Sequence, residues 1–280
     1  MGVGLEKHRP VIVSANATYL YCVVRAPRRP AATKVPPGVP DGTAPDVVAL
    51  APSLWLVTSQ VPLDVYGSPH LDARLRDLDW VSDAAVAHEA VVERFAAAPA
   101  TTVVPMKLFT MFSSIDRAIE DVRGRRAALQ RVLKRIAGCE EWGIRVTRSR
   151  SLPPPVEPGH GKTKRAAGTV QASSGVAFLT ARKNARDAAR QLRARALECA
   201  DAAFKRLRRI ARDARRREAR SEPGTNPPIL EAAFLVPAAA RARFKAEARR
   251  LASACAAAGA DMMLTGPWPA YNFVQEEART

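Results

Sequence analysis

Two short segments contain residue types that could bind a phosphate or a metal ion. The segment Pro158–Thr163 (PGHGKT) resembles a phosphate-binding loop, in which glycines precede a Lys and a Ser or Thr. That motif needs its first glycine at position 156, where this chain has Val156, and no apolar strand leads into it. The segment that begins at His88 (HEAVV) starts like the His-Glu-x-x-His motif of zinc proteases. It has Val92 at the position of the second histidine. We therefore expect no nucleotide or other cofactor and no metal, and we interpret His88 as a hydrogen-bonded core residue.

Other catalytic patterns are missing from the sequence. There is no Gly-x-Ser-x-Gly elbow, and no Ser or Cys is tied by spacing to a His and an acid. The cysteines form no C-x-x-C pair and are interpreted as reduced, mostly buried thiols of a cytosolic protein. They are Cys22, Cys139, Cys199 and Cys255. The sequence predicts a protein without catalytic residues, that is, not an enzyme.

A basic stretch from 181 to 220 could bind an acidic partner. It contains 15 Arg or Lys and 5 Asp or Glu, and apolar residues recur in it at steps of three or four, as in a helix. Such a helix could follow a phosphate backbone, but Phe204 is its only aromatic residue, which disfavours base stacking. A solvated helix face and a contact with an acidic protein are the other readings. The candidate contact residues are Arg208, Arg209 and Arg212.

The segment Gly266–Val274 (GPWPAYNFV) gathers prolines and aromatic residues near the end of the chain. The prolines lack amide donors and fix φ, so the segment cannot continue as an interior strand. We expect it to leave a sheet and to lay Trp268, Tyr271 and Phe273 on a surface. These aromatics either close the core of their own domain or contact another protein.

The composition limits the class of protein. The chain has 280 residues and a formal net charge of +17, which favours acidic partners. Its apolar content is 47% and its aromatic content 6%, so Ala, Val and Leu must form most of the core. No apolar run approaches the roughly 20 residues of a transmembrane segment, and the N-terminus lacks the layout of a signal peptide.

The first hundred residues predict an N-terminal α+β domain, 1–100. Strands are expected at Tyr19–Val24 and over Val47–Val61, the latter broken at Pro52. A helix is expected over 69–98, with a possible break near Trp80. Residues 27–45 are rich in proline and predict a loop.

The remainder, 101–280, predicts a ferredoxin-like domain. Its pattern is strand 101–112, helix 113–138 and strand 141–146, then strand 229–236, helix 237–259 and a last strand ending near Trp268. That order corresponds to a βαββαβ unit with helices on one face of an antiparallel sheet. Residues 147–228 read as an insertion, made of a linker at 147–176 and the basic helical arm at 181–220.

The motifs, in order, resemble the gas vesicle protein F/L family over most of the chain. The ending LTGPWPAYNFV is the most specific of them, and six shorter fragments precede it in the expected order. The chain departs from the usual pattern at Lys107 and Phe109, where Arg and Gly are common. The fragments are YLYCVV, LVTSQVPLDVYG, HEAVVERF, TVVPMKLFTMF, EEWGIRV and EAAFLVP.

The resemblance implies a non-enzymatic accessory protein of gas vesicles, located at the gas vesicle or in the cytoplasm. Its implied partners are the main shell protein and other accessory proteins, and its implied role is in vesicle assembly or nucleation. It also implies two α+β domains, one of them a modified ferredoxin fold. The alternative from the residues alone is a nucleic-acid-binding protein that uses the Arg-rich helix 181–220.

Overall fold

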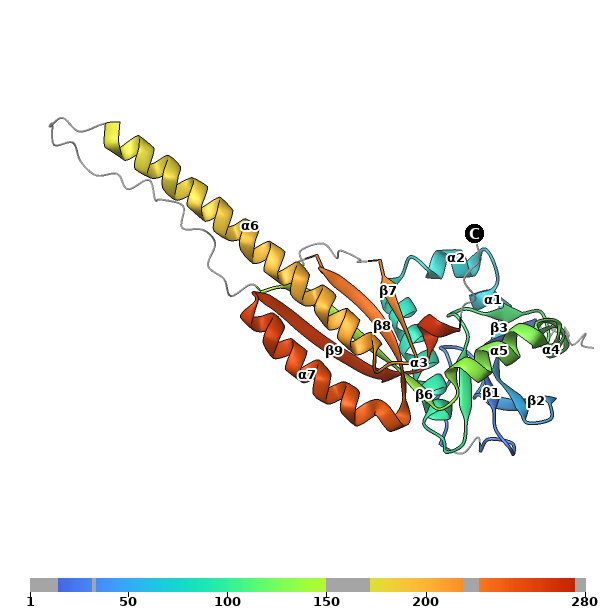
Figure 1. The fold of residues 1–280 in the computed structure, drawn as a ribbon. Coiled ribbons are helices and arrows are strands. Elements are labelled where there is room, and N and C mark those ends of the chain that lie inside the picture. Colours follow the sequence, from blue (N-terminus) through green and yellow to red (C-terminus); the bar gives the residue numbers. More distant parts are fainter. Residues whose placement is uncertain (1–14, 32–33, 150–171, 219–226, 275–280) are drawn as a thin grey trace, which may run out of the picture. The chain divides into compact units, whose positions relative to one another are not determined.

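The computed structural model describes residues 15–31, 34–149, 172–218 and 227–274 (Figure 1). It is a mixed helix and sheet protein with two antiparallel sheets. The chain divides into two compact units. Unit 1 comprises residues 1–138 together with 269–280, and unit 2 comprises residues 139–268. No helix in the described ranges is long and apolar enough to cross a bilayer.

Unit 1 is built on a five-stranded sheet in which β1 has a central place. The strand order is β2-β3-β1-β4, and β5 pairs with the other end of β1. The strands are β1 (Asn16–Arg25), β2 (Asp46–Ala51), β3 (Leu54–Pro62), β4 (Thr102–Pro105) and β5 (Met111–Phe112). The helices are α1 (Leu63–Tyr66), α2 (His70–Arg74), α3 (Leu78–Ala96), α4 (Ile115–Gly124) and α5 (Arg126–Ile136).

Local sequence explains most boundaries in unit 1. The predicted break at Pro52 is confirmed, because Ser53 there adopts φ of 62° in the turn between β2 and β3. The predicted helix 69–98 is also broken, but between α2 and α3, a few residues before the expected position near Trp80, which lies inside α3. Asp77 caps α3 by accepting from the amides of Asp79 and Trp80. Ser114 caps α4 by accepting from the amide of Arg117.

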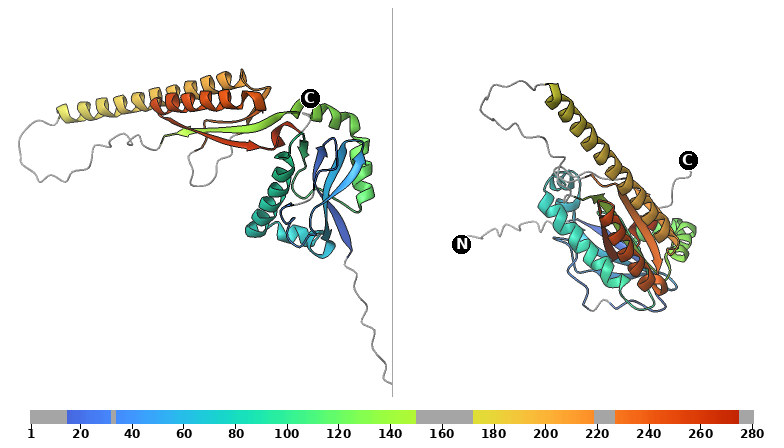
Figure 2. Two further views of the ribbon diagram at one scale, coloured as in Figure 1. Left: turned by 90° about the horizontal axis from the view of Figure 1, so that it is seen from below. Right: turned by 60° about the vertical axis from the view of Figure 1, so that its left-hand side comes forward.

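Unit 2 has a four-stranded antiparallel sheet with strand order β7-β8-β6-β9. Its helices α6 and α7 lie side by side over the same face of the sheet (Figure 2). Its chain order is β6, α6, β7, β8, α7, β9, which is consistent with a ferredoxin-like arrangement. The elements are β6 (Cys139–Arg148), α6 (Ala172–Arg208), β7 (Asp213–Arg217), β8 (Leu230–Pro237), a 3-10 turn η1 (Ala238–Ala240), α7 (Arg241–Ala257) and β9 (Ala260–Trp268).

The core of unit 2 forms where the two helices meet the sheet. Alternate residues of β6 and β8 face the helices, as the two-residue period of a strand requires. Among them, the ring of Phe234 packs against those of Phe204 and Phe244 at centroid distances of 5.6 and 5.5 Å. The small side chains Ala200 and Ala203 let α6 approach closely and are buried.

The segment predicted as an inserted basic arm has a different structure. The helix does not continue to residue 220 but ends at Arg208, and Asp213–Arg217 forms the strand β7. The reason is tertiary pairing: β7 lies against β8 from Asp213↔Leu235 to Arg217↔Glu231. The C-terminal half of α6 covers the sheet of unit 2. Most of the predicted linker 147–176, namely 150–171, and the end of the arm lie outside the described residues.

The domain boundary also differs from the expected position near residue 100. Residues 101–138, including β4 and α5, belong to unit 1 because β4 pairs with β1. The strand β4 thereby extends the sheet of unit 1 and does not start the sheet of unit 2. The chain returns to unit 1 at Pro269, after the last strand of unit 2.

Candidate functional site

A groove of about 680 Å³ in unit 1 is the candidate site. It lies between one face of the β1–β4 part of the sheet and the helices α4 and α5. Most of its lining is apolar, and Lys107, Asp121 and Arg125 place charges on it. The apolar lining consists of Leu20, Val23, Val104, Pro105, Met106, Phe112, Val122, Ala128, Leu129, Val132, Tyr271 and Val274.

The two walls of the groove follow from the strand and helix periods. Leu20 and Val23 of β1 line the groove, whereas Tyr19, Tyr21 and Val24 belong to the core cluster on the α3 side. A register irregularity between Leu20 and Cys22 shifts the alternation along β1. On the opposite wall Val122 of α4 and a stripe of α5 face the sheet. That stripe comprises Ala128, Leu129 and Val132, at helical spacing.

The C-terminal segment borders this groove. After β9 it forms a short 3-10 turn, η2 (Tyr271–Phe273), which begins where Tyr271 donates its amide to the carbonyl of Pro269 at 2.7 Å. The side chain of Phe273 is fully buried. The guanidinium of Arg135 in α5 donates to the carbonyl oxygen of Phe273. Tyr271 and Val274 thereby become part of the groove lining.

Tyr271 also lies beside Glu89 of α3 within unit 1. Burial raises the pKa of Tyr271, and the negative charge of Glu89 raises it further, so the phenol stays protonated. Burial likewise raises the pKa of Glu89, an effect that the Tyr271 hydroxyl partly offsets. The segment is thus held by α3 on one side and by α5 on the other.

Behind the groove, His88 is a core residue, as predicted. It is 3% exposed, and its Nδ1 lies 2.8 Å from the hydroxyl of Tyr19. Burial lowers the pKa of His88 to about 4, so its imidazole is neutral at physiological pH. The same Tyr19 hydroxyl accepts a hydrogen bond from the amide of Phe109 at 3.2 Å. These two hydrogen bonds link His88, Tyr19 and the backbone of Phe109 within unit 1.

Phe109 adopts a backbone conformation that glycine prefers. Its φ is 60°, in the left-handed region. Phe109 is also the position where the family that the sequence resembles commonly has Gly. Its ring stacks on Trp80 with a centroid distance of 5.6 Å and an interplanar angle of 1°. Stacking and the Tyr19 contact offset the backbone strain in the loop that ends at the groove.

The structure places the six candidate contact residues predicted from the sequence, three aromatics and three arginines, in different surroundings. Trp268, at the end of β9, is 43% exposed, Tyr271 is half-buried and Phe273 is buried. The three arginines are exposed and lie at or just after the end of α6. Arg209 lines a cleft with arginines of α7, whereas Arg208 and Arg212 do not.

Sequence reasoning missed most of the groove. The helix predicted over 113–138 contains α4 and α5, which form one wall of the groove. The strands of the opposite wall could not be assigned without knowing that β4 pairs with β1. The segment 158–163, which resembles a phosphate-binding loop but was not expected to bind a nucleotide, lies outside the described residues. In the part of the chain that is described, no three His, Cys, Asp or Glu side chains gather to hold a metal ion.

Comparison with known proteins shows which proteins this chain is similar to. The curated gas vesicle protein L of Streptomyces sp. (strain CB03234) is 33% identical over 234 residues, which are 79% of each chain. The crystal structure of the gas vesicle protein GvpF from Anabaena sp. PCC7120 has a similar fold, with a TM-score of 0.62 and 17% identity. It covers 94% of this chain and 97% of that chain.

A second solved structure, GvpF from Microcystis aeruginosa, aligns with a TM-score of 0.58 and 14% identity over 93% of this chain and 99% of that chain. The family model described as "Gas vesicle synthesis protein GvpL/GvpF" matches residues 17–275. That match begins in β1 and extends through the C-terminal segment beside the groove. The chain therefore belongs to the GvpL/GvpF family of gas vesicle proteins.

Proposed function

We propose that this protein is a non-enzymatic assembly factor that holds an apolar segment of the gas vesicle shell protein in the groove of unit 1. The observation that carries the proposal is the mostly apolar lining of this groove in a member of a gas vesicle synthesis family. The protein would act at the gas vesicle or in the cytoplasm, before or during shell growth. Other accessory proteins are its further proposed partners.

The physical need for such a factor comes from the shell subunit. A small protein with apolar, strand-forming surfaces aggregates unless those surfaces are covered before it joins the shell. A groove with an apolar floor and charged residues beside it can cover one such segment and release it later. Partner contacts of Trp268 and the arginines after α6 would add to this, outside the groove.

The C-terminal aromatics have a supporting role in this proposal. Phe273 anchors the segment, and Tyr271 and Val274 present part of the groove lining. Removing the segment would therefore damage the groove wall as well as any direct contact. A substitution that fills the groove from α5 is a cleaner test than a truncation.

Deletion in the native host tests the function. Cells without the gene should lose flotation and show few or no normal vesicles by electron microscopy, and the wild-type gene should restore both. A strain with no paralogous gene is needed, so that no related protein compensates. Deleted cells of such a strain that still float with normal vesicles would overturn the proposal.

A further inference from the structure

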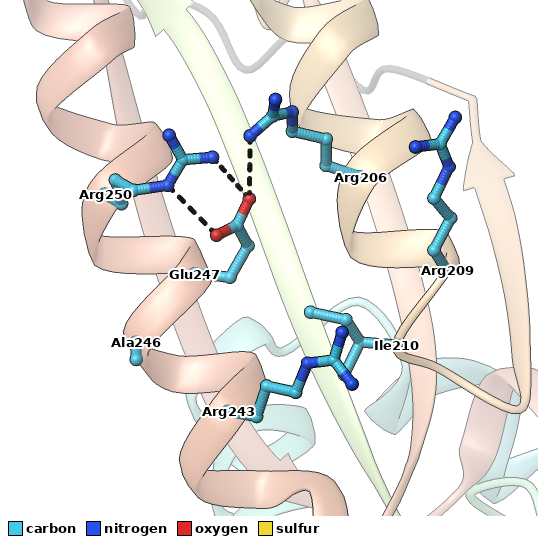
Figure 3. Close-up of a pocket in the computed structure, with 7 residues that line it drawn as sticks. All are labelled: Arg206, Arg209, Ile210, Arg243, Ala246, Glu247 and Arg250. Carbon is cyan, nitrogen blue, oxygen red and sulfur yellow. Dashed lines mark hydrogen bonds and ion pairs between the residues drawn. The ribbon is translucent and has the colours of Figure 1, made fainter.

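Unit 2 has a cleft of about 400 Å³ between the C-terminal end of α6 and the helix α7 (Figure 3). Four arginines and one glutamate line it: Arg206 and Arg209 from α6 and the turn after it, and Arg243, Glu247 and Arg250 from α7. The cleft therefore combines a net charge of +3 with a site large enough for a few side chains.

Two of these arginines already bind a carboxylate, that of Glu247. Its carboxylate accepts hydrogen bonds from Nε and Nη2 of Arg250 at 3.0 and 2.7 Å. Arg206 reaches it from α6 with Nη1 at 3.4 Å, so that two helices converge on one carboxylate (Figure 3). The planar guanidinium fork matches a carboxylate with two parallel hydrogen bonds.

The side chains of Arg209 and Arg243 remain available to bind a further carboxylate. Both are exposed, and within the described part of the chain neither has a carboxylate partner. Arg243 extends from α7 toward Ile210 (Figure 3). Repulsion among the four guanidinium groups is only partly relieved by Glu247, so another carboxylate entering the cleft would be attracted.

The lining favours a protein segment over a nucleic acid. Ile210 and Ala246 supply apolar surface, which suits the side chains between carboxylates of a peptide. No aromatic residue lines the cleft for base stacking. A continuous phosphate backbone would have to pass the fixed negative charge of Glu247, whereas separate side-chain carboxylates can reach Arg209 and Arg243 from either side of it.

We propose that the α6–α7 cleft is a docking site for an acidic segment of a partner protein, whose Asp or Glu side chains bind Arg209 and Arg243. This inference holds whether or not the groove of unit 1 binds the shell protein, because it concerns other residues and another ligand chemistry. It assigns a specific site to part of the basic charge of the chain.

The test uses the purified full-length protein and a fluorescein-labelled oligoglutamate peptide, followed by fluorescence anisotropy at fixed salt. The double substitution Arg209→Gln and Arg243→Gln should weaken binding by about tenfold. The matched control is Arg186→Gln with Arg190→Gln, which removes the same charge from exposed positions of α6 and should change the affinity by less than about twofold. Circular dichroism checks that both variants are folded.

Three results would overturn the proposal. The first is absence of peptide binding by the folded wild type at low salt. The second is an equal loss in both double variants, which would indicate attraction by the overall charge only. The third is displacement of the peptide by a short DNA duplex that also binds the Arg209 and Arg243 double variant more weakly than the wild type. That result would assign the cleft to nucleic acid.

Discussion

The guanidinium of Arg135 donates a hydrogen bond to the carbonyl oxygen of Phe273, and it thereby joins the C-terminal segment to α5 within unit 1. The two residues are separated by 138 positions in the sequence. Through this contact and the burial of Phe273, the last described residues of the chain become part of the wall of the groove. Packing of Phe273 within unit 1 thus accounts for part of the distinctive terminal motif.

Truncation of Phe273 should destabilise unit 1. The variant Phe273→Ala removes a fully buried ring and should lower the free energy of unfolding by about 3–5 kcal/mol, measured by urea denaturation. Trp268→Ala is the control from the same motif, because Trp268 is 43% exposed, and it should cost about 1 kcal/mol or less. Equal losses in the two variants would contradict the assigned packing.

Backbone strain at Phe109 should appear in a comparison of two small residues. Phe109→Ala and Phe109→Gly both remove the ring that stacks on Trp80, but only glycine relieves the φ of 60°. The glycine variant should therefore be more stable than the alanine variant by about 1 kcal/mol. Thermal or urea unfolding of the pair checks this, and an alanine variant of equal or higher stability would exclude the strain.

His88 should make stability depend on pH. Its pKa falls from 6.5 to about 4 on folding, so between these values the unfolded chain binds a proton that the folded chain does not. The free energy of unfolding should therefore fall as pH is lowered through this window, by roughly 1.4 kcal/mol per pH unit from this residue.

The variant His88→Gln should lack that contribution. Urea denaturation of both proteins across the same pH range isolates it, because the other titrating groups are common to both. Parallel pH profiles would show that His88 takes up its proton equally in the folded and unfolded chains.

Cys199 and Cys255 should form a disulfide under oxidation. Their sulfur atoms are 2.6 Å apart, between α6 and α7. Burial raises the pKa of Cys255 to about 12, so the reaction should be slow at neutral pH and faster in alkaline buffer. With oxidised glutathione as the oxidant, each thiol loses its hydrogen and the oxidant is reduced to two thiols.

Intact-mass and peptide analysis can detect this bond. The oxidised protein should lose the mass of two hydrogens and yield one linked peptide pair, which Cys199→Ser abolishes and Cys139→Ser does not. Alkylation of both thiols after oxidation would show that the two helices do not hold them together.

The elements that could be predicted from the sequence are those with a strong local pattern. The break at Pro52, the cap at Ser114 and the alternation of β6 around Trp142 and Ile144 are all encoded within a few residues. These features depend on turn chemistry, capping and the strand period, which do not need the rest of the fold.

The missed features depend on long-range pairing. Asp213–Arg217 has the sequence DARRR, with no β-branched or aromatic residue, so its propensity predicts helix and only the available edge of β8 makes it a strand. The assignment of β4 to unit 1 follows from pairing with β1, about eighty positions earlier. The approach of Arg243 and Arg250 of α7 to Arg206 of α6 likewise depends on how the two helices pack.

Co-purification of the shell protein with groove variants tests the central claim most directly. Ala128 lines the groove from α5, whereas its neighbour Ala127 is exposed outside it, so Ala128→Arg and Ala127→Arg add the same charge to the same helix. Each tagged variant replaces the wild type in the native host, and the shell protein that co-purifies is quantified. The account predicts that Ala128→Arg recovers about a tenth or less of the wild-type amount while Ala127→Arg recovers it fully. Full recovery with a folded Ala128→Arg variant would contradict the claim that the groove holds the shell protein.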